Sequence, residues 1–166
     1  MQPWRTIIFS EKDHYSFRPE IYLILMGLMI SLVAWVISDT NLFGHKQNSI
    51  FDIWTITHIA TGAVLAYFVI SLRSVNFHHP IMLLLLISFG WEIVEHYIEL
   101  SEITFLANWF AGEETFLNRL IADQIAVVLG FLLIKWEPRL LYPALLVALG
   151  ILFVHVWVGD SMFLYN

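Results

Sequence analysis

Long uncharged stretches separated by short polar ones dominate the pattern of this chain. Five apolar runs predict five helices, over residues 21–38, 53–72, 81–100, 119–136 and 140–158. Each has roughly the length of 17–25 residues that a helix needs to cross the hydrocarbon core of a bilayer. The pattern therefore predicts an all-α, polytopic membrane helix bundle with about five transmembrane helices, which forms a single membrane domain over residues 1–166.

Two further stretches are too mixed in polarity to cross a membrane. Residues 1–20 carry scattered aromatic side chains among charges, and residues 101–118 place Trp109 and Phe110 beside Glu113 and Glu114. Because aromatic side chains suit the membrane–water interface, both stretches are predicted to be interfacial segments, the second on the outer surface.

Composition narrows the class of protein and its partners. Hydrophobic residues make up 59% of the chain and charged residues 13%, and the mean hydropathy is +0.75, which excludes an ordinary soluble domain. The chain has no cysteine, so disulfides and thiolate metal sites are excluded. A net charge of -6 without a basic run argues against nucleic acid. The predicted partners are membrane lipids, with other membrane protein subunits as a further option.

The basic residues predict an orientation. With five spans, most of them fall on the N-terminal side, namely Arg5, Lys12, Arg18, Arg73, Lys135 and Arg139, whereas Lys46 and Arg119 fall on the other side. Because cytoplasmic loops carry an excess of Lys and Arg, we predict a cytoplasmic N-terminus and an outward C-terminus. The predicted location is a bacterial inner (plasma) membrane.

The third apolar run ends in a ladder of ionisable groups, Glu92, Glu95, His96 and Glu99. Positions three and four apart share a face of a helix, so Glu92, then Glu95 or His96, then Glu99 form one stripe. Carboxylates within a membrane span are costly and usually face a bundle interior or a wet cavity. We therefore expect any chemistry of the chain at this stripe.

Other spans carry ionisable residues at matching depths. His58 lies about one turn into the second run, Asp123 about one turn into the fourth, and His155 about one turn from the end of the fifth. With the predicted orientation, these groups and the Glu92 stripe share the outer leaflet, so the sequence predicts that they converge there.

Carboxylate and imidazole groups are ligands for a hard or borderline divalent cation. The predicted metal ligands are His58, Glu92, His96 and Asp123, since Glu92 and His96 are four apart on one helix and the others come from neighbouring spans. A divalent metal ion is the candidate cofactor. General acid–base catalysis on a lipid-linked substrate is an alternative, with Glu92 and Asp123 as candidate catalytic residues. Whether the protein is an enzyme stays open.

Structural explanations also exist for these residues. Arg119 and Asp123 are four apart and can neutralise each other on one helix, and His58 on a face of small residues can be a packing histidine. The chain is then a non-catalytic accessory or structural subunit of a larger membrane protein complex. A transporter is less favoured, because the spans show no paired broken helices.

Three elements of the sequence resemble the VanZ-like family of small polytopic membrane proteins. They are residues 52–62 (DIWTITHIATG), 90–96 (GWEIVEH) and 119–131 (RLIADQIAVVLGF). The resemblance covers roughly residues 50–136, and the residues that it carries over are His58, Glu92 or Glu95, Arg119, Asp123 and Gly130. That family is associated with glycopeptide-antibiotic resistance, so the resemblance implies a membrane bundle that acts near the cell envelope. Together with the ionisable cluster, it predicts an outward-facing acidic/His site that binds a divalent cation or a polar lipid or envelope head group.

Overall fold

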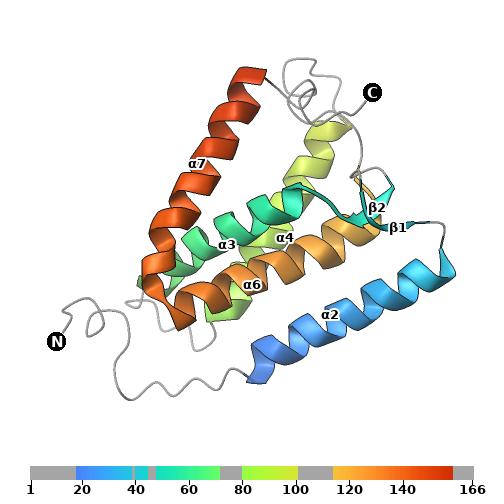
Figure 1. Cartoon of the computed structure of the whole chain (residues 1–166), viewed down its shortest axis with the longest axis horizontal. Coiled ribbons are helices and arrows are strands. Elements are labelled where there is room, and N and C mark those ends of the chain that lie inside the picture. Colours follow the sequence, from blue (N-terminus) through green and yellow to red (C-terminus); the bar gives the residue numbers. More distant parts are fainter. Residues whose placement is uncertain (1–17, 39, 45–47, 72–79, 101–113, 159–166) are drawn as a thin grey trace.

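A computed structural model describes residues 18–38, 40–44, 48–71, 80–100 and 114–158, and this part of the chain is a helix bundle (Figure 1). Its α-helices are α2 (Arg18–Ile37), α3 (Trp54–Ser71), α4 (Pro80–Glu99), α6 (Asp123–Trp136) and α7 (Leu141–Val158). A π-helical turn, η1 (Asn118–Ala122), runs directly into α6, and a 3₁₀ turn, η2 (Pro138–Leu140), precedes α7. Each apolar run of the sequence coincides largely with one of these helices, so the all-α prediction is confirmed.

Among the described residues, three helices are long and apolar enough to cross a membrane. They cover Glu20–Ile37, Trp54–Ser71 and Pro80–Glu99, and a shorter apolar helix covers Pro138–Val154. By contrast, α6 has only 14 residues, and most of them are buried inside the protein. The predicted interfacial segments 1–20 and 101–118 lie largely outside the described residues, as does the His155 side chain.

The connection between the first two runs holds a feature that the sequence pattern missed. Strand β1 (Asn41–Phe43) pairs in parallel with β2 (Ser49–Phe51), with Asn41 opposite Ser49. Three residues are too few to show the alternation by which a strand is recognised. Ile50 is fully buried in a small core with Ala34 and Ala122, so the strand pair fixes the start of α3 against α2 and η1.

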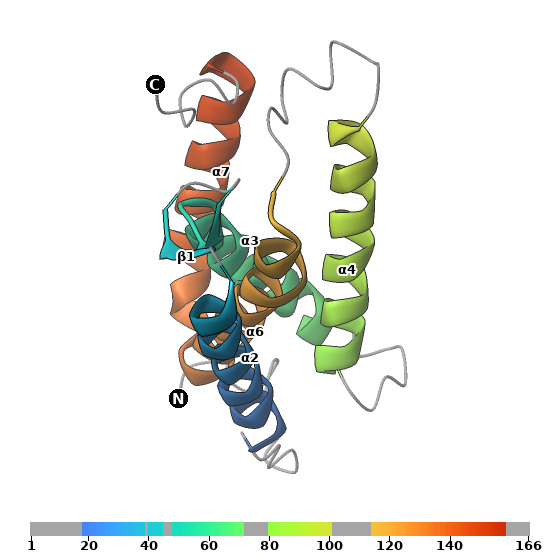
Figure 2. The same cartoon turned by 90° about the vertical axis from the view of Figure 1, so that its right-hand side faces the viewer.

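Helix α6 lies at the centre of the bundle, between α2 on one side and α3 and α4 on the other (Figures 1 and 2). The main apolar core forms where α3, α4 and α6 meet, and its buried side chains include Ala66, Ile70, Leu84, Val128, Phe131 and Ile134. The outer faces of the surrounding helices expose large apolar side chains, among them Met29 and Val36 of α2, Leu86 and Ile93 of α4, and Leu146 and Phe153 of α7.

Helices α3 and α6 touch at their backbones. A Cβ atom at Gly130 would lie 2.3 Å from the Ile59 carbonyl oxygen and 2.5 Å from the Ala63 nitrogen, and one at Gly62 would lie 2.7 Å from the Val127 Cα. Only glycine fits at such a crossing, as in the small-residue interfaces of membrane helices. This contact sets the distance between α3 and α6.

The two ends of the bundle carry different polar residues. At one end, Lys135 Nζ lies 3.0 Å from Glu20 Oε1 and joins the end of α6 to the start of α2. At the other end, the strand pair and η1 gather beside the start of α3, the start of α6 and the second half of α4 (Figure 1). The candidate functional residues lie at this second end.

Candidate metal-binding site

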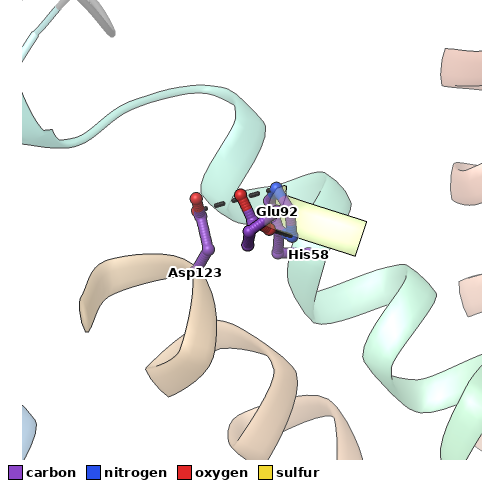
Figure 3. A group of neighbouring side chains, drawn as sticks. All are labelled: His58, Glu92 and Asp123. Carbon is purple, nitrogen blue, oxygen red and sulfur yellow. Dashed lines mark ion pairs between the residues drawn. The ribbon is translucent and has the colours of Figure 1, made fainter. Parts of the chain in front are cut away.

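His58 of α3, Glu92 of α4 and Asp123 of α6 come together from three helices (Figure 3). His58 Nδ1 lies 3.8 Å from Glu92 Oε1, and His58 Nε2 lies 3.7 Å from Asp123 Oδ1. One potential ligand atom from each residue lies within 4.8 Å of the other two. We call these three residues the inner group.

His58 is positioned by a helix cap. The Asp52 Oδ1 atom accepts hydrogen bonds from the backbone N–H groups of Trp54 (2.8 Å) and Thr55 (3.2 Å), and the Asp52 N–H donates to Thr55 Oγ1 (3.2 Å). This reciprocal pattern fixes the first turn of a helix. His58 follows about one turn later, so the cap determines where its imidazole lies.

A second set of hydrogen bonds positions Asp123. The Thr115 hydroxyl accepts from the Asn118 N–H (3.1 Å) and donates to the Ser49 carbonyl (2.9 Å). The Asn118 Nδ2 atom donates to Asp52 Oδ2 at 3.0 Å. Asp52 therefore caps α3 with one oxygen and holds the start of η1 with the other, which ties His58 and Asp123 to one framework.

The π-helical turn decides where Arg119 and Asp123 point. The Asp123 N–H donates to the carbonyl of Asn118, five residues earlier, so this turn is wider than an α-helical one. Residues four apart no longer stack, and Arg119 turns toward α4 while Asp123 turns toward His58. The mutual neutralisation of Arg119 and Asp123 that an α-helix would allow is replaced by these contacts. Wide turns of this kind are frequent at functional sites.

The carboxylates of the inner group lack hydrogen bonds. Glu92 and Asp123 are each 1% exposed, and all four of their carboxylate oxygens are buried without a hydrogen-bond partner among the described residues. Their ion-pair separations from His58 and Arg119, between 3.7 and 3.9 Å, are too long for hydrogen bonds. Buried charge without such partners is costly, and the nearby Arg119 guanidinium makes no hydrogen bond to either carboxylate.

The rest of the α4 ladder divides between two faces. Glu95 is buried and the side chain of Glu99 is 1% exposed, whereas His96 is exposed. His96 does not join the inner group, because it lies on the exposed side of α4 with Ile93 and Tyr97, whereas the buried side carries Glu92 and Glu95. Of the four predicted ligands, the structure brings His58, Glu92 and Asp123 together and leaves His96 outside.

Some residues of the site had no clear signal in the sequence. Asp52 and Asn118 come from a connection and from a segment predicted to be interfacial, and their mutual contact depends on the fold. Glu114 stands just before η1 and lies 3.9 Å from Arg119. The cap signature, Asp52 followed three residues later by Thr55, was the one local pattern by which the start of α3 was recognisable.

Comparison with known proteins adds no functional assignment. The chain matches no profile of a known protein family, no curated protein and no solved structure. The interpretation of the site therefore depends on its geometry and chemistry.

Proposed function

We propose that this chain is a VanZ-like integral membrane protein that binds one divalent cation through His58, Glu92 and Asp123. The observation that carries the proposal is the set of four carboxylate oxygens of Glu92 and Asp123, all buried and without hydrogen bonds. A doubly charged ion supplies positive charge in direct contact with these carboxylates. The ion also coordinates each carboxylate, which accepts no hydrogen bond from the described residues.

The spacing of the ligand atoms suits a small divalent ion. Tetrahedral ligands at about 2.0–2.2 Å from a zinc ion lie about 3.3–3.6 Å from one another. The separations of 3.8 and 3.7 Å involve different nitrogens of His58, and a metal ion binds only one of them. One ligand atom from each residue lies within 4.8 Å of the other two, so side-chain rotations that bring these atoms about 1 Å closer complete the coordination. An imidazole with two carboxylates favours zinc, manganese or iron over calcium or magnesium.

Three protein ligands leave one or more coordination positions for a further oxygen. Catalytic zinc sites have such an open position, whereas structural sites are closed. The oxygen of a polar lipid or envelope head group can fill it, which joins the two ligand classes predicted from the sequence. An ion bound in this way could also act as a Lewis acid toward the head group.

Membrane insertion is supported by the three long apolar helices and by the large apolar side chains on the outer faces of the bundle. In the full arrangement that we propose, α6 with η1 and α7 provide two further spans. The inner group then lies toward the outer surface of a bacterial inner membrane, and the Glu20–Lys135 pair lies toward the cytoplasm.

The test is elemental analysis and native mass spectrometry of the protein purified in a mild detergent, followed by titration with Zn²⁺. We expect one ion per chain, and its loss in His58→Ala, Glu92→Gln and Asp123→Asn. His96→Ala is the matched control, because this exposed histidine of the same bundle end should leave binding unchanged.

A chain that holds no ion, or equal binding in all four variants, would contradict the proposal. If such a chain also co-purifies with other membrane proteins, the alternative of a non-catalytic accessory subunit replaces it.

A further inference from the structure

Arg119 lies between the inner group and a second set of acids. Its Nη1 atom lies 3.9 Å from Glu92 Oε2, and its Nη2 atom lies 2.6 Å from Glu99 Oε2 and 3.9 Å from Glu114 Oε2. Glu99 and Glu114 belong with Glu95 to an outer group, in which one carboxylate oxygen of each residue lies within 4.8 Å of the others. The Arg119 side chain is 8% exposed, so its charge acts inside the protein.

The two groups of acids differ in how the chain neutralises them. In the outer group, Arg119 makes a short charge-assisted hydrogen bond to Glu99, which is among the stronger polar contacts in proteins. Toward the inner group, Arg119 Nη1 donates to the main-chain carbonyl of Glu92 at 3.0 Å. The carboxylates of Glu92 and Asp123 accept no hydrogen bond among the described residues.

We propose that Arg119 is a specificity-determining residue, the resident cation of the outer group, which confines an exchangeable divalent ion to the inner group. This inference rests on the proposed cation binding. The guanidinium lies within a few ångströms of both groups, but only an ion in the outer group would have to displace its hydrogen bond to Glu99. An ion in the inner group displaces no donor. The chain therefore holds one ion although its described residues form two acidic groups.

The first test compares the two groups by substitution in the full-length protein in detergent, titrated with Zn²⁺ alone. Glu114→Gln and Glu95→Gln should each retain one ion, with a Kd within about threefold of the parent. Asp123→Asn should weaken binding by a hundredfold or more. If Glu114→Gln or Glu95→Gln loses the ion as Asp123→Asn does, the ion lies in the outer group and the role of Arg119 is overturned, while cation binding itself stands. A parent protein without any Zn²⁺ overturns the proposed function and this inference with it.

The second test changes Arg119. Arg119→Lys keeps the positive charge and should leave the stoichiometry at one Zn²⁺ per chain, whereas Arg119→Gln removes it and should raise the stoichiometry to two. A folded Arg119→Gln variant that still binds a single ion with the affinity of the parent would overturn the proposal. If Arg119→Gln does not fold, the stoichiometry of Arg119→Lys and Glu114→Gln tests the proposal instead. Two Zn²⁺ ions bound to either variant would show that the positive charge of Arg119 does not limit the protein to one ion.

Discussion

Replacing Gly130 by alanine should separate α3 from α6. The new Cβ atom would lie 2.3 Å from the Ile59 carbonyl oxygen, 2.5 Å from the Ala63 nitrogen and 2.9 Å from the Gly62 carbonyl carbon. Optimal contacts between heavy atoms are about 3.5–4.0 Å long, so the two helices must move apart by about 1 Å or more. Backbone atoms cannot rotate away as a side chain can, which places the cost at the upper end of the usual range for overpacking.

The magnitude follows from two opposing effects. Overpacking of a core costs about 1–3 kcal/mol, and we take about 3 kcal/mol here. Alanine is about 1 kcal/mol more favourable than glycine within a helix. The net loss of unfolding free energy is therefore about 2 kcal/mol, which lowers Tm by roughly 4–8 °C for a chain of this size.

Gly90→Ala is the matched control, because a Cβ atom at this position of α4 meets nothing within 4 Å. It should leave Tm unchanged or raise it through the gain of about 1 kcal/mol in helix propensity. Both variants are measured by thermal unfolding in the same detergent.

The Gly130→Ala substitution should also change the geometry of the inner group. His58 and Asp123 lie about one turn before the contact of Gly62 with Val127, so a wider crossing lengthens their separation of 3.7 Å. We expect Gly130→Ala to weaken Zn²⁺ binding at least tenfold, and Gly90→Ala to leave it unchanged. A Gly130→Ala protein as stable as Gly90→Ala would refute the close crossing, and with it the register that brings the inner group together.

Three further predictions concern the site and the topology. Glu92→Gln should keep the fold, with Tm equal to that of the parent or higher, because a charge inside the membrane span that we propose for α4 costs up to about 2.5–3.5 kcal/mol. Unfolding of this variant would instead make the acid structural. Asp52→Ala should lower the unfolding free energy by about 2 kcal/mol in a denaturation assay, since it removes the α3 cap and the hydrogen bond to Asn118. Asp52→Asn can still cap the helix, so its unfolding free energy should fall by less in the same assay. A reporter fused after Asn166 should appear outside the cytoplasm, and a cytoplasmic signal would show that the proposed span number or orientation is wrong.

The sequence by itself determined the helices and singled out the three residues that meet in the inner group. In the membrane that we propose, uncharged runs of this length form helices because every backbone polar group must be satisfied within the segment. The same reasoning singled out Glu92, since a carboxylate after a long uncharged run must face the interior. His58 and Asp123 were found because the depths of residues on successive spans follow from counting along each helix.

Only the tertiary structure decided the contacts that depend on rotation and on distance between helices. The choice between Glu95 and His96 required the direction of the α4 face, and a difference of one residue exchanges a buried side chain for an exposed one. The π-helical turn separated Arg119 from Asp123, and spacing along the sequence carries no sign of such a turn. The link between Asp52 and Asn118 joins residues 66 apart. Periodicity describes one helix at a time, whereas these features arise where helices meet, so the packing of α3, α4 and α6 had to determine them.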